Sequence, residues 1–238
     1  MPTFFADAFT PADNGTNATT TITITPPASM VSGDLVVVYL QQRGTATFSI
    51  GVNGGQTWTP LGRNVGTANV ALETYWTTYN GTWGANPRFD FSAGTNTSAV
   101  MLVFRPDDNT NVWESENLAT TNAAAASTIT VTGITPNFGS NVTIASWMTA
   151  DDNTWGTLTG TTWIKTGLEA QYRNLAGNDQ SMTLAYQLQT TAAATNNVSQ
   201  TQLTLGTDAT AWRRVTFYET ASVLGGFDPF GQMGFFGL

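Results

Sequence analysis

The first apolar positions of the chain alternate with polar positions at a period of two residues. Ile22 and Ile24 share one face of an extended segment, and the threonines around them share the other face. Two prolines at 26–27 end the run, because proline cannot donate to a strand ladder. The pattern predicts a β-strand with one buried face.

Other segments extend this prediction to the rest of the first half. Residues 70–79 alternate, with Leu72 and Glu73 on opposite faces. Residues 35–40 and 99–104 are apolar at every position, which is typical of central strands buried on both faces. Helix signals are weak throughout, and the short alanine run at 123–126 is interpreted as a linker.

The same series of strand patterns occurs twice along the chain. The matches are 21–25 with 128–132 at an offset of 107, 33–40 with 140–147 at 107, Trp58 with Trp163 at 105, 72–76 with 182–186 at 110, 89–91 with 203–205 at 114, and 101–103 with 215–217 at 114. The offset changes only between strands, as insertions in loops would make it do. Each half therefore supplies about four main strands.

These patterns predict an all-β fold, specifically a jelly-roll-like antiparallel β-sandwich with two pseudo-repeated halves. The halves are expected at about 20–106 and 127–219, within one sandwich domain over 1–220. Two separate small sandwiches are the alternative. Residues 221–238 form a Gly/Phe-rich C-terminal tail outside this domain.

The amino-acid composition limits the kinds of molecule that the protein is expected to bind. Charged residues make up only 10% of the 238 residues, and the net charge is −8. Because a nucleic-acid surface needs clustered Lys and Arg, this balance argues against nucleic acid, and it disfavours an anionic membrane surface for the same reason. The N-terminus has no basic segment and no long apolar run, so we expect no signal peptide and synthesis in a cytoplasm.

The residue types of most catalytic and metal sites are missing. The chain has no histidine and no cysteine, which removes Ser-His-Asp catalysis, thiolate chemistry and histidine-based metal sites. Lys165 is the only lysine and has no motif around it. Glu73 lies in a strong strand pattern, but no second carboxylate is evident on its face. We therefore expect no catalytic residues, no metal site and no cofactor.

Two other groups of side chains allow a binding site. The turns at 107–109 and 151–153 are rich in oxygen ligands, but they lack the spacing of a calcium loop, and Asp and Asn are also good turn formers. Trp83, Trp113 and Trp155 are the tryptophans expected to be exposed, and they are the candidate glycan-binding residues because aromatic faces stack on sugars.

The tail has a different character from the rest of the chain. Residues 225–238 contain four Phe, a Met and a Leu among five Gly, with no strand alternation. The tail either folds back over its own sandwich or docks on a neighbouring subunit. Under the second reading its partner-binding residues are Phe227, Phe230, Met233, Phe235, Phe236 and Leu238.

Several of these segments together resemble a domain of tailed-phage virion proteins. In the first half they are GDLVVV at 33–38, TWTPLGR at 57–63, LETYW at 72–76 and AVMLVFR at 99–105. In the second half they are DDNTW at 151–155, TW at 162–163, GNDQSMTLA at 177–185 and AAT at 193–195. The chain departs from the family where FRP at 104–106 replaces a frequent YRG, and in its tail.

The resemblance covers roughly residues 20–220 and implies a β-sandwich found in head-decoration, minor tail and adhesion proteins. The first functional hypothesis is therefore a capsid decoration or cement protein, located in the virion, whose partners are the phage capsid protein and copies of itself. The second is a tail adhesion module that binds host-surface glycans. The third is a single jelly-roll capsid subunit.

Overall fold

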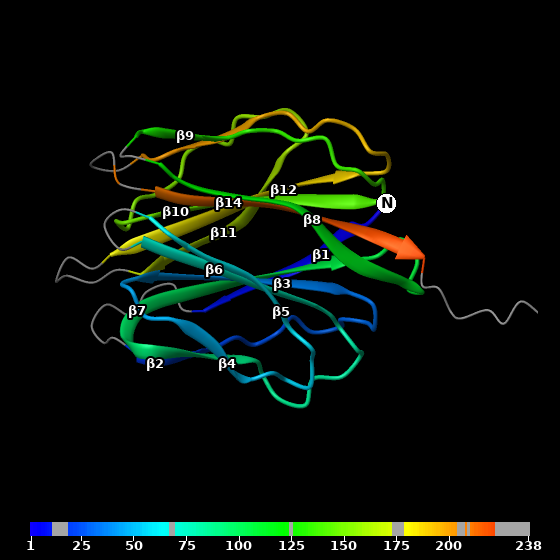
Figure 1. Ribbon diagram of the computed structural model, residues 1–238, viewed down its shortest axis with the longest axis horizontal. Coiled ribbons are helices and arrows are strands. Elements are labelled where there is room, and N and C mark those ends of the chain that lie inside the picture. Colours follow the sequence, from blue (N-terminus) through cyan, green and yellow to red (C-terminus); the bar gives the residue numbers. More distant parts are fainter. Residues whose placement is uncertain are drawn as a thin grey trace, which may run out of the picture.

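The structure is a computed structural model that describes residues 1–10, 19–66, 70–123, 126–172, 179–203, 208 and 210–221 (Figure 1). In these residues the chain forms strands and turns and no helix, so the prediction of an all-β fold is confirmed. No helix of the described residues is long and apolar enough to cross a membrane.

The first half of the chain contains the strands expected from alternating or apolar segments, and three further strands at 3–10, 48–52 and 59–65. Together these strands are β1 (Thr3–Thr10), β2 (Thr19–Thr23), β3 (Leu35–Arg43), β4 (Phe48–Val52), β5 (Thr59–Val65), β6 (Val70–Thr78) and β7 (Arg88–Arg105). The C-terminal part of β7 lies in a large sheet of order β1-β7-β3-β6-β5, and its N-terminal part pairs with β2 and β4. One long strand thus connects a large sheet to a small one.

The second half forms another large sheet and another small one. Its strands are β8 (Asn111–Ala123), β9 (Thr128–Val131), β10 (Asn141–Thr149), β11 (Ile164–Tyr172), β12 (Gln180–Gln189), β13 (Val198–Thr201) and β14 (Thr210–Ala221). The large sheet has the order β11-β12-β10-β14-β8, and β13 pairs with β9. When only the five strands of each large sheet are numbered in chain order, both sheets read first, fifth, second, fourth and third, starting from β1 and from β8. The jelly-roll connections, the repeat as a superposition and the division into domains stay predictions.

The two large sheets pack face to face, and a small sheet covers the outer side of each (Figure 1). One apolar cluster lies between the large sheets and contains Leu35, Phe104 and Phe217. A second cluster, around Phe89, lies under β2 and β4, and a third, around Trp147, lies under β9 and β13. Because each large sheet is buried on both faces, its central strands read as continuous apolar runs.

The pairing register corrects two matches of the proposed repeat. Leu35 pairs with Phe104, and its counterpart Val142 pairs with Phe217, which gives an offset of 217 − 104 = 113 rather than 114 for the last strand. At an offset of 114, Met101 would match Val215, but these side chains lie in different clusters. A shift of one residue moves every side chain of a strand to the opposite face.

The match between 89–91 and 203–205 is also wrong. Phe89 is fully buried and pairs with Ile22, whereas Leu203 is 63% exposed and lies beyond the end of β13. The residue that pairs with Ile129, the counterpart of Ile22, is Gln200. Apolar alternation alone selected the wrong segment, because the strand that occupies this position carries a glutamine.

Strands β1 and β8 are among those that the sequence patterns did not predict. Phe4 of β1 packs against the cluster between the large sheets, and Phe5 packs against the cluster under β2 and β4. Strand β8 ends at Ala123, so the segment before the expected linker at 123–126 is an edge strand of the second sheet. Residues 124–125 of that linker lie outside the described residues.

Candidate functional site

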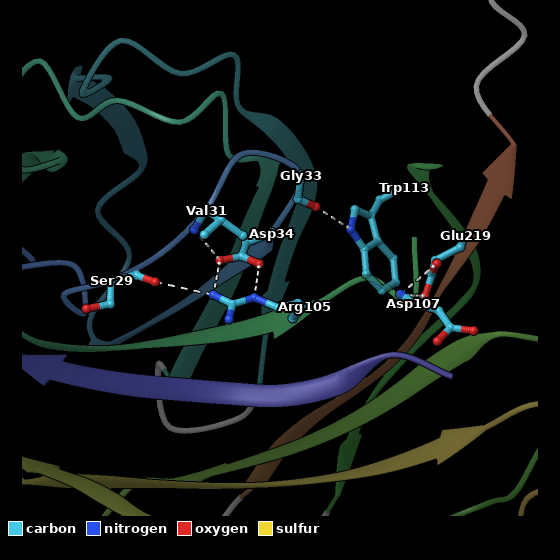
Figure 2. A network of polar contacts seen from close by, with 8 residues as sticks. All are labelled: Ser29, Val31, Gly33, Asp34, Arg105, Asp107, Trp113 and Glu219. Atoms are coloured by element: carbon cyan, nitrogen blue, oxygen red, sulfur yellow. Dashed lines mark hydrogen bonds and ion pairs between the residues drawn. The ribbon is translucent and has the colours of Figure 1, made fainter. Parts of the chain in front are cut away.

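A network of polar contacts lies at the end of the molecule where β3 begins and β7 ends (Figure 2). Asp34 is fully buried, and its carboxylate accepts hydrogen bonds from Arg105 Nε at 3.1 Å and Arg105 Nη2 at 3.3 Å. The backbone N–H of Val31 donates to the same carboxylate at 2.8 Å. The Arg105 guanidinium also lies 4.2 Å from the ring centre of Phe5 and donates to the carbonyl of Ser29. Both charges are therefore held within the first half.

The same end of the molecule connects the two halves. Gly33, with a φ of +96°, turns the chain into β3, and a Cβ there would lie 3.2 Å from the Asn109 carbonyl oxygen. The carbonyl of Gly33 accepts a hydrogen bond at 2.9 Å from Nε1 of Trp113, which lies on β8 of the second sheet. The turn that positions Asp34 is thus also the contact point for the other half.

Glu219 attaches the end of β14 to this network. Both of its carboxylate oxygens accept the backbone N–H of Asp107 at 3.0 Å, and Asn111 Nδ2 donates to it at 2.8 Å. Strand β14 ends two residues later, at Ala221 (Figure 2). The C-terminal end of β14 is therefore hydrogen-bonded to the segment that connects the halves.

Two of the three tryptophans expected to be exposed are buried. Trp113 is 4% exposed and belongs to the cluster between the large sheets. Trp155 is also 4% exposed and packs with Trp147 in the third cluster. The prediction of exposure is wrong for both tryptophans. Polar residues surround each of them in the sequence, but in the fold the opposite sheet covers Trp113 and the small sheet of β9 and β13 covers Trp155. Trp83 is partly buried and stacks on Tyr79 at 5.1 Å between ring centres.

An open, shallow hollow lies beside Trp58. It has a volume of about 660 Å³ and is lined by Ile50, Gly51, Val52, Asn53, Gln56, Thr57 and Trp58. Gln56 is buried and holds the adjoining loop, since its Nε2 donates to Thr82 O at 2.8 Å and its Oε1 accepts the N–H of Asn80. Asn53 and Thr57 are exposed on the rim. The lining combines a mostly buried tryptophan, two apolar side chains and neutral polar groups.

Glu73, the carboxylate weighed for acid–base chemistry, lies mostly buried in β6. Its Oε1 accepts a hydrogen bond at 2.7 Å from the hydroxyl of Tyr75. Burial raises the pKa of Glu73, and the hydrogen bond from Tyr75 and the charges of Arg63 and Arg213 oppose the rise. These contacts give Glu73 a role within the sheet.

The two acidic turns differ in structure. Asp108 accepts hydrogen bonds from the N–H and hydroxyl of Thr110, both at 2.8 Å, which is the arrangement of a turn former. In the second half, carboxylate oxygens of Asp151, Asp152 and Asp179 lie within 4.8 Å of one another. Exposed acidic groups often cluster without an ion, and nothing else in the described residues around these three indicates a ligand.

The partner-binding residues of the tail lie outside the described residues. They are Phe227, Phe230, Met233, Phe235, Phe236 and Leu238. The structure instead identifies Asp34, Arg105 and Glu219, which sequence reasoning did not select. The pairing of an aspartate directly before β3 with an arginine at the end of β7 becomes visible only when the two strands are adjacent.

The chain was compared with protein-family models, with curated proteins and with solved structures, and no family model, curated protein or solved structure matched it.

Proposed function

We propose that this chain is a structural protein of a tailed-phage virion, where it decorates the capsid and is anchored by its C-terminal tail. The sequence resemblance over residues 20–220 supports a role in the virion, and the all-β fold agrees with the β-sandwich that the resemblance implies. The observation that carries the anchoring role is the attachment of the end of β14 by Glu219, next to the buried Asp34–Arg105 pair.

If the tail docks on a partner, the rigid attachment of β14 holds the whole β-sandwich at that partner. Burying four Phe, a Met and a Leu contributes on the order of 10 kcal/mol, at about 1.5 to 3 kcal/mol per side chain. Ordering a Gly-rich segment costs about 1 to 2 kcal/mol per residue, so over residues 225–238 the cost offsets the whole gain for an isolated tail. Docking therefore requires a preformed groove, which a capsid protein or a second copy supplies more readily than an already filled sandwich.

The location in the virion is tested by detecting the protein on purified phage particles. Particles of the phage that encodes this chain are purified on a density gradient and labelled with an antibody against the β-sandwich. We expect the label on the head, at a regular repeat. Label on the tail tip alone would favour the adhesion module, and unlabelled particles would refute a virion role.

The test of the anchor is a chain that ends at Ser222. We expect it to fold with the stability of the full chain and to lose its place on the particle or in the oligomer. The matched control is the full chain with Glu219→Gln, which keeps the tail and weakens only its attachment point, so we expect a smaller loss of occupancy. Full occupancy by the shortened chain would contradict the anchoring role.

A glycan-binding adhesion module is the second candidate, and the hollow beside Trp58 favours it. Its volume of about 660 Å³ is within the usual range for small ligands, and a tryptophan side chain with Asn53 and Thr57 suits neutral sugar hydroxyls. A glycan array probed with the full chain is the test. Binding that is lost in Asn53→Ala but retained in the chain ending at Ser222 would support this candidate, and an array without signal would remove it.

A further inference from the structure

Arg213 is a buried cation between the two large sheets. It lies on β14 at the same face as Val215 and Phe217, and it is 1% exposed. Its Nη2 donates to the carbonyl of Gly62 at 2.6 Å, so the guanidinium reaches β5 of the opposite sheet. Within the described residues, its Nε and Nη1 have no hydrogen-bond partner, and none of the ion pairs includes it.

Two hydroxyl groups on the opposite sheet are in the same situation. Tyr39 of β3 and Thr74 of β6 are cross-strand neighbours, and both are fully buried. Their hydroxyls have no hydrogen-bond partner among the described residues. Tyr39 lies close enough to Arg213 to interact with it electrostatically, and burial raises the pKa of Tyr39, so its hydroxyl keeps its proton and can donate.

The positive charge of Arg213 has no ion-pair partner among the described residues. Their carboxylates all lie beyond ion-pair distance of its guanidinium, and Glu73 interacts with it only at longer range. An unpaired charge in a buried position is costly, and buried charges are normally paired. Arg213 thus presents a buried, unpaired charge and, with Tyr39 and Thr74, several unused donors.

We propose that Arg213, Tyr39 and Thr74 together bind a small inorganic anion, chloride under ordinary conditions, between the two large sheets. Nε and Nη1 of Arg213 and the two hydroxyls supply N–H and O–H donors, which are the groups that coordinate a halide. Because the three residues are 0% or 1% exposed, the ligand is enclosed when the sheets pack, which favours a small ion. A water molecule would satisfy the donors but would leave the charge unmatched. This inference is independent of the proposed function.

The deciding experiment is crystallography of the full chain with bromide in place of chloride. The protein is refolded and crystallised in sodium bromide, and data are collected at the bromine absorption edge. We expect an anomalous peak within hydrogen-bond distance of Arg213 Nε and Nη1 and of the Tyr39 hydroxyl. Density at this position without an anomalous signal would show that water fills it, and would overturn the proposal.

Thermal unfolding measures the affinity of the same site. A halide that binds only the folded protein raises Tm, by roughly 3 to 6 °C at a tenfold excess over its dissociation constant. Sodium gluconate at equal ionic strength is the reference salt. We expect Tyr39→Phe with Thr74→Val, which removes only hydroxyls, to reduce the chloride-dependent rise, and Arg213→Gln to abolish it.

Arg214→Gln is the matched control, because Arg214 is the next residue of β14 and contacts the carbonyl of Thr132 instead. We expect this variant to keep the full chloride dependence. If Arg213→Gln does not fold, the hydroxyl variant carries the test. A Tm that is the same in chloride and in gluconate for the parent protein would count against the anion as firmly as a missing bromide peak.

Discussion

Removal of the Asp34 carboxylate tests whether the polar network at the end of the molecule stabilises the fold. Asp34 is 0% exposed as a side chain, whereas Arg105 is 32% exposed. Asp34→Ala removes the acceptor of two bonds from Arg105 and of one bond from the Val31 N–H. The variant therefore leaves a partly buried cation and a backbone donor without their partner.

The magnitude follows from the burial of the pair. Loss of one partner of a buried ion pair costs about 3 to 5 kcal/mol. Because Arg105 is one-third exposed and regains some water, we expect the lower end, about 3 kcal/mol. For a chain of this length that loss lowers Tm by roughly 6 to 12 °C. Asp34→Asn keeps the volume and one oxygen acceptor for Val31, so we expect a smaller loss.

Urea unfolding followed by tryptophan fluorescence measures these changes, with Trp113 as a nearby reporter. The matched control is Asp90→Ala, which breaks the ion pair of Arg88 with Asp90, where the side chains are 39% and 35% exposed. Exposed pairs contribute little, so we expect the control to unfold almost as the parent protein does. If Asp34→Ala were no less stable than Asp90→Ala, burial would not explain the contribution of the Asp34–Arg105 pair to the stability.

Three further predictions concern the packed layers. Gly54→Ala is expected to destabilise the protein more than Gly62→Ala. Both glycines have a positive φ (+67° and +80°), but only at Gly54 would the new Cβ lie 2.7 Å from the Trp83 ring. Equal losses of stability in urea unfolding would contradict this. Trp147→Ala, at a fully buried indole, is expected to cost about 3 to 5 kcal/mol in the same assay, and a loss near 1 kcal/mol would contradict the third core. Burial raises the pKa of Glu73 in the folded protein, so the stability linked to its proton is present below the unfolded pKa and is lost as pH rises through the folded pKa. Glu73→Gln should therefore gain stability relative to the parent as pH rises above the unfolded pKa, and a difference that does not change with pH would refute this.

The sequence alone was sufficient for the fold class and for most central strands. Alternation in 21–25 and 70–79 and the continuous apolar runs at 35–40 and 99–104 all correspond to strands. This works because the side-chain period of a strand is a local property of an extended backbone. A run that is apolar on both faces also predicted burial on both faces, which the two outer layers of the structure explain.

The edge strands and the exposure of single side chains depended on the tertiary structure. β8 reads as polar because its outward positions carry Glu114 and Glu116, yet its inward-facing Trp113 completes the core between the large sheets. β1 lacks a single apolar face, since Phe4 and Phe5 pack into different cores. In both strands the partner surface comes from distant parts of the chain, so no local pattern reveals it.

The candidate sites show the same division. The sequence drew attention to tryptophans, acidic turns and the tail, because those residue types carry chemistry by themselves. Whether an indole is exposed depends on the layer that covers it, and for Trp155 that layer includes β13, more than forty residues away in the chain. The Asp34–Arg105 pair and the group of Arg213, Tyr39 and Thr74 exist only because non-local strand pairing and sheet packing bring their charges and donors together. Local periodicity determines which way a side chain points, and long-range packing determines what it meets.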